Sequence, residues 1–382
     1  MRNKEEKRLQ RVVALFCATL FALFSFLFVA VYQSPLLEAL YDHVATGKLD
    51  YNGYLVAAVV SPLLTLLALW LNRIAKFQRE WTAMAYLPSA LLLAFITDID
   101  RSVYVGGWSL TSWIVIFSVA MFVYAALAFV LQRVLFEKIK NLAMSTNRMI
   151  WRNLILFVIM FCLTGTLSNG EENFKREALV ASRCKAGDAE GALAVGYKSL
   201  DASRELSAMR AYILAKENSL GERLFEYPQL YGADGLLPFQ HQTSPLSPDS
   251  VATLLGDAIK KNENTLGYLR RLAYADTLAL AARDYYLSAL LLEKEVIEFE
   301  AELARMCGSY RADSLPKHYR EALLLLNEFS NEHSPNLEDS VLNSKFRSLR
   351  EVESKYDDAL MRNNYVRKAF GRTYWWYFLY GG

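Results

Sequence analysis

Residues 148–173 read RMIWRNLILFVIMFCLTGTLSNGEEN, and this stretch divides the chain in two. It begins with a basic and aromatic collar, formed by Arg148, Trp151 and Arg152, and an uncharged run follows. With its flanking groups, that run is long enough for a helix that crosses a bilayer. The sequence before it is apolar and the sequence after it is polar. The side of the membrane on which the stretch emerges therefore decides where the second half works.

The composition also indicates a membrane part and a water-soluble part. Of the 382 residues, 53% are hydrophobic, which is high for a soluble protein of this length. The excess lies in the first 170 residues. We therefore predict an all-α protein with a cytoplasmic basic head at 1–11, a five-helix transmembrane domain at 12–170 and an extracytoplasmic helical domain at 171–382.

Five apolar runs are expected to cross the lipid bilayer as helices. They cover residues 12–32, 54–71, 81–97, 108–131 and 153–168. The first run is full length and lacks a small-x-small cleavage site, which indicates a span that is retained rather than removed as a signal peptide. Pro62 and Pro88 lie inside the second and third runs, where neighbouring helices can satisfy the freed carbonyl groups.

Tryptophans lie near the ends of these runs, where amphipathic rings prefer the depth of the lipid headgroups. The membrane-interface residues predicted on this ground are Trp70, Trp81, Trp108, Trp113 and Trp151. Inside the runs, hydrogen bonds between helices are expected from hydroxyl side chains. These are Ser25, Ser61, Thr65 and Ser118. No ionisable residue lies in the middle of a run, which argues against a pump or a coupled transporter.

The loop charges predict the orientation in the membrane. The basic head, the 72–80 loop and the 132–152 segment together carry thirteen Lys and Arg residues. The alternate loops carry only Lys48 and Arg101. Because loops rich in Lys and Arg stay in the cytoplasm, the N-terminus is expected inside and the second half outside.

The second half has a helical and amphipathic pattern. Between residues 173 and 228 it resembles a tetratricopeptide repeat. The matching residues are Leu179 in a first helix, a turn at Gly187-Asp188, and Ala192 and Leu200 in a second helix from 189 to 200. Arg176 and Gly196 depart from the family pattern, which usually has large aromatic residues there, and no proline closes the unit.

A second, weaker helix pair at 211–228 extends this likeness. Isolated repeats cannot bury their apolar faces, so the resemblance implies a longer stack of helices. Taken together, the spans and the helical domain also resemble an uncharacterised family of bacterial polytopic inner-membrane proteins. That resemblance implies a soluble half in the periplasm.

Two segments of the second half have two interpretations each. A loop at about 228–248 is either a functional loop or a solvated connector, and Ser247-Pro248 is expected to start the helix that follows it. The aromatic stretch at 374–380 either packs on the helical stack or lies on the outer leaflet. We favour packing on protein because the rings surround the helix. In the other interpretation Trp375 and Trp376 are membrane-interface residues.

The sequence predicts no metal site and no cofactor. The four cysteines form no metal motif, and no HExxH occurs. Cys184 and Cys307 could pair, although nothing in their spacing requires it. Asp98 and Asp100 at the outer end of the third run are the candidate catalytic pair of an alternative function. In it, a membrane-embedded transferase uses them on a lipid-linked sugar substrate.

The favoured function is binding of a protein or peptide partner by the outer helical domain, in a scaffold or assembly role without catalysis. Stacked helix pairs form a concave groove that suits this task. The candidate partner-binding residues are Tyr197, Arg204, Tyr212 and Lys216. Basic and acidic residues alternate in this half. This pattern indicates a solvated helical surface and argues against a nucleic-acid-binding patch.

Overall fold

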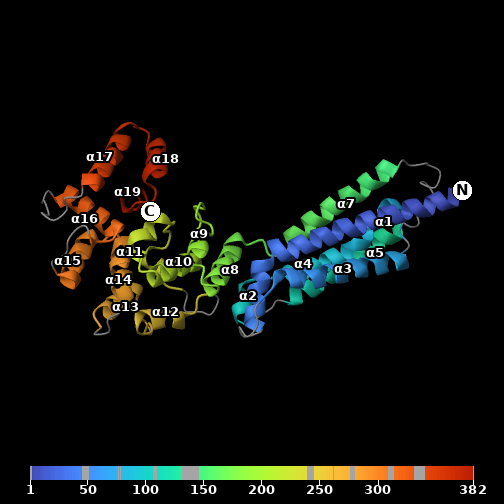
Figure 1. Cartoon of the computed structure of the whole chain (residues 1–382), viewed down its shortest axis with the longest axis horizontal. Coiled ribbons are helices and arrows are strands. Elements are labelled where there is room, and N and C mark those ends of the chain that lie inside the picture. The colour runs from blue at the N-terminus through green and yellow to red at the C-terminus, as the bar shows by residue number, and fades with distance from the viewer. Residues whose placement is uncertain are drawn as a thin grey trace. The chain divides into compact units, whose positions relative to one another are not determined.

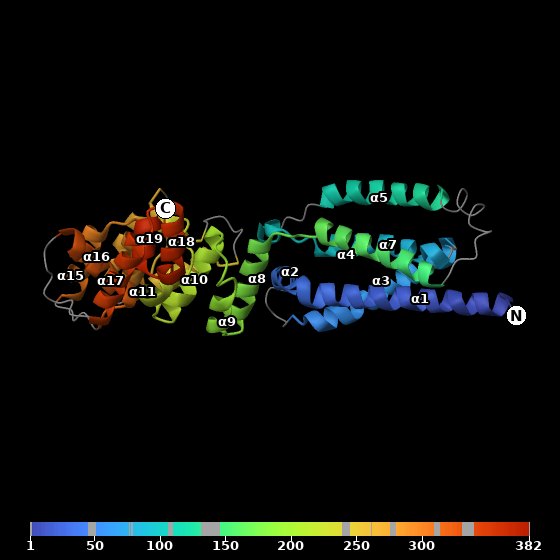
Figure 2. The ribbon, with the colours of Figure 1, turned by 90° about the horizontal axis from the view of Figure 1, so that it is seen from above.

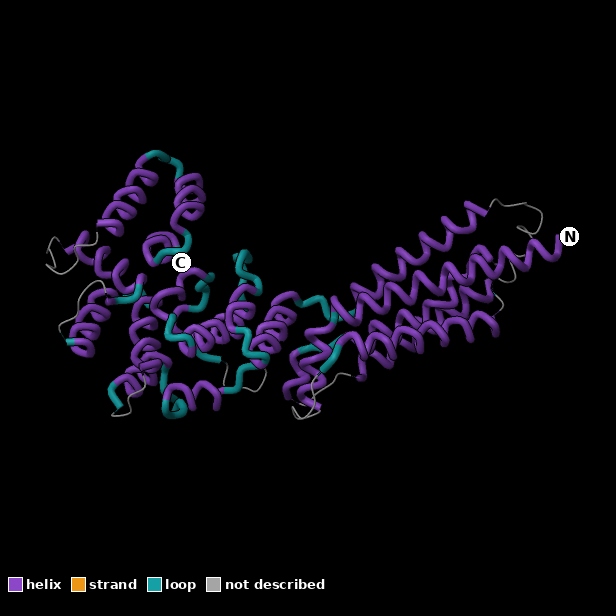
Figure 3. The backbone as a smooth tube through the Cα atoms, viewed as in Figure 1, coloured by secondary structure: helices purple, strands orange, loops and turns teal. Residues whose placement is uncertain are grey.

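The computed structural model consists of helices joined by turns (Figures 1 and 3). It describes residues 2–44, 51–75, 77, 79–105, 110–130, 146–238, 245–260, 262–275, 280–308, 314–330 and 340–381. Within these ranges every regular element is a helix, so the predicted all-α class is confirmed for them. The chain forms two compact units, Met1–Ala178 and Leu179–Gly382, and the division falls inside one helix.

The first unit is a bundle of long helices that run side by side (Figure 2). Helix α1 packs on α3 and α7, and α4 packs on α3, α5 and α7. The elements are α1 (Arg2–Leu27), the π-helix η1 (Phe28–Tyr32), α2 (Ser34–Val44), α3 (Gly53–Ala75), η2 (Arg79–Tyr86), α4 (Leu87–Thr97), η3 (Arg101–Val105), α5 (Leu110–Val130), α7 (Thr146–Leu167) and the first half of α8 (Glu172–Lys185).

Three helices of this unit are long and apolar enough to cross a membrane. They cover Arg8–Tyr32, Gly53–Ala75 and Asn147–Leu167. Only 22% to 33% of each apolar window is buried within the protein. Large apolar surfaces of this extent need an apolar surrounding, and a lipid bilayer provides it. The three helices coincide with the first, second and fifth predicted spans.

The other two predicted spans lie over shorter apolar helices, Trp81–Thr97 and Trp113–Ala126. In the first of these the backbone turns out of the helical conformation at Trp81 (φ −122°). The α-helix proper then starts at Leu87, with Pro88 in its first turn. Pro88 therefore lies in the first turn of a helix, where a backbone N–H has no partner within the helix. The sequence predicted instead that Pro88 lies in the interior of a long span.

Small and polar side chains bring the helices of the bundle together. The buried residues of α3 are Ala57, Ser61, Leu64 and Ala68, which form a single stripe. Small residues let backbones approach closely where lipid removes the hydrophobic drive between helices. Ser25 Oγ donates to Ser61 Oγ at 2.8 Å, as predicted, and this bond links α1 to α3.

The other two predicted hydroxyl groups bond within their own helices. Thr65 donates to the carbonyl of Ser61, and Ser118 donates to that of Ile114. A different side chain, Asn153, instead accepts the backbone N–H of Ala83 at 2.8 Å. This bond ties α7 to η2 and satisfies a donor that the irregular backbone leaves open.

The second unit is built around α14 (Leu280–Leu292), which is buried on nearly all sides. Helices α10, α11, α12, α13 and α15 all contact α14. The remaining elements are α9 (Ala189–Ala194), α10 (Arg204–Lys216), α11 (Leu220–Arg223), η5 (Leu224–Glu226), η6 (Gly232–Leu236), α12 (Pro248–Leu255), α13 (Thr265–Ala273), α15 (Val296–Cys307), α16 (Lys317–Ser330), α17 (Ser340–Ser354), α18 (Ala359–Phe370) and α19 (Tyr374–Tyr380).

The predicted helix pair near residue 187 forms only in part. The turn is as expected: Gly187 has φ +76°, and Asp188 caps α9 by accepting the N–H of Gly191. However, α9 ends at Ala194 and does not reach Leu200, because Gly196 turns the chain at φ +63°. Leu200 is consequently 63% exposed and is no packing residue of a repeat.

The loop expected at about 228–248 packs on the core over its described residues. Ala233, Leu236 and Leu237 are buried, and η6 contacts α10 and α14. The predicted helix start that follows is confirmed, since Ser247 caps α12 by accepting the N–H of Asp249.

Candidate functional site

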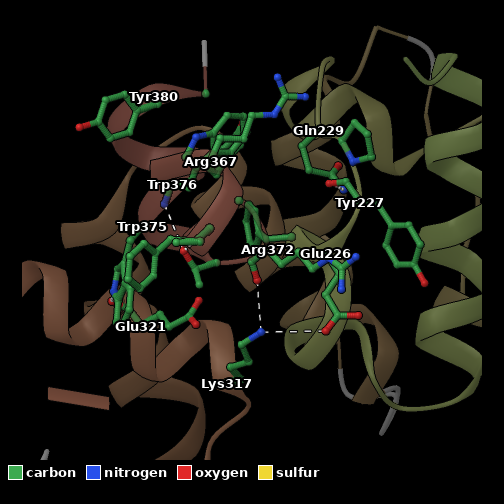
Figure 4. A pocket seen from close by; sticks show the side chains of 18 of the residues that line it. Glu226, Tyr227, Gln229, Lys317, Glu321, Arg367, Arg372, Trp375, Trp376 and Tyr380 are labelled. Atoms are coloured by element: carbon green, nitrogen blue, oxygen red, sulfur yellow. Dashed lines mark hydrogen bonds and ion pairs between the residues drawn. The ribbon is translucent and has the colours of Figure 1, made fainter. Parts of the chain in front are cut away.

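A groove of about 1640 Å³ in the second unit is the candidate functional site (Figure 4). Six parts of the chain line it: the segment at 197–200, the stretch from α11 to residue 232, Lys294, the N-terminal parts of α16 and of α17, and the chain from Asn363 in α18 through α19. Small-molecule pockets are typically about 300–1,000 Å³, so the groove is large enough for a polymer segment.

Helix α19 forms one wall of the groove and is held there by the buried residue Glu321. The Glu321 carboxylate accepts the backbone N–H of Tyr374 at 2.7 Å, and its backbone carbonyl accepts the indole N–H of Trp375 at 2.8 Å. Tyr377 donates its hydroxyl to the carbonyl of Leu292 at 2.7 Å. These bonds satisfy the polar groups of a buried aromatic helix, and the stretch at 374–380 therefore packs on protein.

This packing corrects one interface assignment. Trp375 is fully buried, with its ring 5.0 Å from that of Phe346, so no surface is left for lipid headgroups. Trp376 is half-buried and faces the groove, where the Arg367 guanidinium lies 5.6 Å from its ring centre. Both tryptophan side chains therefore contact other side chains of the second unit.

The groove lining is strongly basic. It contains eight Lys and Arg residues against three Glu residues. The cations are Lys198, Lys294, Lys317, Arg320, Lys345, Arg367, Lys368 and Arg372. A concave surface with one dominant sign of charge concentrates ligands of the opposite sign.

The three carboxylates of the lining already have partners within the protein. Glu222 accepts the backbone N–H of Lys317 at 2.6 Å, and Glu226 lies 4.0 Å from the Lys317 ammonium group. Glu321 is engaged by α19 as described above. By contrast, Lys198, Lys345 and Lys368 are exposed and form no ion pair with any carboxylate in the described part of the chain.

Aromatic rings lie between these cations. The Arg372 guanidinium stands 4.4 Å from the ring centre of Tyr197, and the Lys294 ammonium group stands 5.6 Å from that of Tyr377. Such contacts orient cations over ring faces without neutralising their charge. Burial raises the pKa of Tyr377 to about 12, so this phenol stays neutral at physiological pH.

Of the four predicted partner-binding residues, only Tyr197 lines the groove. Arg204 lies at the start of α10. Tyr212 and Lys216 lie further along α10 and contact each other, with the ammonium group 5.6 Å from the ring centre. Sequence reasoning missed the three exposed lysines of the groove, because they come from segments up to 170 positions apart and no local pattern relates them.

The candidate catalytic pair has structural partners in the first unit. Asp98 accepts the indole N–H of Trp113 at 2.6 Å. Asp100 accepts the backbone N–H and the hydroxyl of Ser102, which is a local turn. No group of His, Cys, Asp or Glu that could hold a metal ion occurs among the described residues. Cys184 and Cys307 are free thiols.

The predicted interface tryptophans of the first unit differ in exposure. Trp70 and Trp151 are 58% and 56% exposed, and their place at the lipid interface stays a prediction. Trp81 is half-buried, and Trp113 is buried with its indole on Asp98. Trp113 is therefore a packing residue within the protein, because Asp98 offers its N–H a partner. Trp108 lies outside the described residues.

Next to Asp98 and Asp100, a charged cluster joins two parts of the first unit. Arg101 binds the fully buried carboxylate of Glu177 through two nitrogens, at 2.7 and 2.8 Å, and it also binds Glu171 at 2.9 Å. A buried carboxylate needs such a bidentate partner. The cluster fastens the start of α8 to η3, which is a structural task.

Comparison with known proteins leaves the activity open. No curated protein and no solved structure matches the chain. No tetratricopeptide repeat is identified in it. The C-terminal region, residues 249–381, matches a family of unknown function, DUF6057.

Proposed function

We propose that this chain is a multi-pass membrane protein whose second unit binds a segment of a partner protein in the groove. The supporting observation is the lining, which combines exposed lysines, exposed aliphatic side chains and half-buried aromatic rings in one large concavity. Aromatic and Arg-rich concave surfaces are typical of protein-recognition sites. In this proposal the protein acts as a scaffold that holds its partner at the membrane.

The topology belongs to the same proposal. Five spans, with the two shorter apolar helices completing the count, would leave the N-terminus in the cytoplasm and the second unit outside, in the periplasm of a bacterium. The thirteen-to-two distribution of Lys and Arg over alternate loops supports this orientation.

The exposed thiol of Cys307 gives a direct test of topology. In spheroplasts, a membrane-impermeant maleimide should label Cys307 before lysis, and a Cys307→Ser variant should lose that signal. Labelling that requires lysis would reverse the proposed orientation.

The transferase alternative gains no support from the geometry. Asp98 and Asp100 are both engaged in local hydrogen bonds, and neither shares a metal-binding group in the described residues.

Site-specific photo-crosslinking in the full-length protein tests the groove. A photoreactive amino acid replaces Lys345 or Lys368 in the groove, and matched variants carry it at the exposed residues Lys216 and Lys355. We expect a discrete adduct at both groove positions and none at the controls. Adducts of equal yield at all four positions, or at the control positions alone, would contradict a binding role for the groove.

A further inference from the structure

We infer that the partner segment is an acidic peptide that also carries an aromatic or aliphatic side chain. This inference rests on the proposed function and states the chemistry of its ligand. Three features carry it: the uncompensated positive charge, the arrangement of rings beside that charge, and the aliphatic rim of the groove.

The charge balance calls for an anionic ligand. Each lining carboxylate is already bonded within the protein, whereas Lys198, Lys345 and Lys368 have no acidic partner among the described residues. These lysines come from three different segments: the chain after α9, helix α17 and helix α18. An extended chain with several carboxylates can reach cations on separate walls, which a single compact anion cannot do. Electrostatic complementarity of this kind gives specificity and speeds association.

The rings next to the cations give a place for an apolar side chain. Arg372 covers Tyr197, and Arg367 covers Trp376, so each ring pairs a planar apolar face with a positive group. Figure 4 shows Arg367 beside Trp376, with Arg372 nearer the centre of the view. An aromatic residue of the ligand that is flanked by carboxylates matches such a pair in both shape and charge.

The rim distinguishes a peptide from an anionic polysaccharide. Leu200, Leu230 and Val341 line the groove and are each more than half exposed. Sugars stack on aromatic rings and offer little to aliphatic side chains, whereas peptide side chains bury them with a gain of about 25 cal/mol per Å². The acidic peptide is therefore the occupant that uses every part of the lining.

Binding of synthetic copolymers to the full-length protein in lipid nanodiscs tests the inference. The probes are fluorescent poly(Glu,Tyr), poly(Lys,Tyr) with the opposite charge, and dextran sulfate as an anion that is not a peptide. We expect poly(Glu,Tyr) to bind at least about tenfold more tightly than either of the other two.

Two triple variants separate the groove from general surface charge. Lys198→Ala, Lys345→Ala and Lys368→Ala together remove the three exposed groove lysines that have no acidic partner among the described residues. Lys185→Ala, Lys216→Ala and Lys355→Ala make the same change in net charge at exposed positions outside the groove. We expect the groove variant to weaken poly(Glu,Tyr) binding about tenfold and the control variant less than about twofold.

The outcomes distinguish this inference from the function on which it rests. Equal affinity for poly(Lys,Tyr), equal affinity for dextran sulfate, or equal losses in the two triple variants would overturn the acidic-peptide inference. Groove-specific crosslinks at Lys345 and Lys368 would still support the proposed function in that case. Absence of those crosslinks would instead contradict the proposed function itself.

Discussion

In the first unit Leu63 and Phe122 are exposed, whereas in the second unit Tyr285 and Trp375 are fully buried. Both units are helical, so the difference lies in what surrounds them. Helix α3 buries one stripe of mostly small residues and leaves its large side chains outside. Helix α14 instead buries large side chains on nearly all its faces. The large apolar side chains of the first unit thus face outward, as in helices that contact lipid. Those of the second unit are surrounded by protein.

Trp375→Ala should have the largest effect, because a fully buried tryptophan leaves a large cavity when it is truncated. We expect the second unit to lose about 3–5 kcal/mol of unfolding free energy. Thermal unfolding followed by circular dichroism in detergent measures the loss. The exposed Trp151→Ala in the first unit is the control, and an equal loss there would break the comparison between the units.

Arg101→Ala tests a buried ion pair of the first unit, in which Arg101 binds the carboxylate of Glu177. Its removal leaves the Glu177 carboxylate buried without this partner, and we expect a cost of about 3 kcal/mol. Arg176→Ala, which affects a pair with the largely exposed Glu172, should cost less than about 1 kcal/mol. Proteolysis at increasing denaturant concentration compares the two variants. Similar costs would show that Glu177 is hydrated in the folded protein.

Asp284 should give the second unit a pH-dependent stability. Burial raises its pKa to about 6, above the ordinary value of 3.8. A carboxyl group with a raised pKa binds its proton more tightly when folded, so the contribution of Asp284 to stability is highest at acidic pH and is lost as the pH rises from about 4 to about 6. We expect a loss of about 2 kcal/mol over that range.

Asp284→Asn should flatten this profile in a pH series of unfolding experiments, since the amide does not titrate. The exposed Asp357→Asn is the matched control and should leave the profile unchanged. A profile that is unaltered by Asp284→Asn would assign the pH dependence to another group.

Ser61→Ala should have the smallest effect and sharpens the account of the first unit. Hydrogen bonds between membrane helices contribute about 0.6 kcal/mol on average, and we expect a loss of that size. Ser118→Ala removes a bond within one helix and should cost less. Steric-trap or detergent unfolding of the two variants measures the difference. A larger effect at Ser118 would refute the role of Ser61 in joining α1 to α3.

Much of the local structure could be predicted from the sequence. The three long apolar helices, the cap at Ser247 and the turn at Gly187-Asp188 depend on neighbouring residues, so short-range patterns contain them. The early end of α9 was missed because the apolar residue Leu200 suggested a buried helix face. The glycine at position 196 outweighs that pattern by turning the backbone.

The candidate site could be predicted only at Tyr197. The charged groove residues follow ordinary patterns in their own helices, and each of them taken alone indicates a solvated face. The basic character of the groove arises because cations from five separate parts of the chain line the same concavity.

The sequence by itself determined the helical class, the apolar spans and the polar second half, because hydropathy and periodicity act over one helix at a time. Only the tertiary structure decided that Trp375 is a core residue, that Asp98 accepts the indole N–H of Trp113, and that Lys198, Lys345 and Lys368 share one groove. Those outcomes depend on which distant segments meet, and long-range packing settles that.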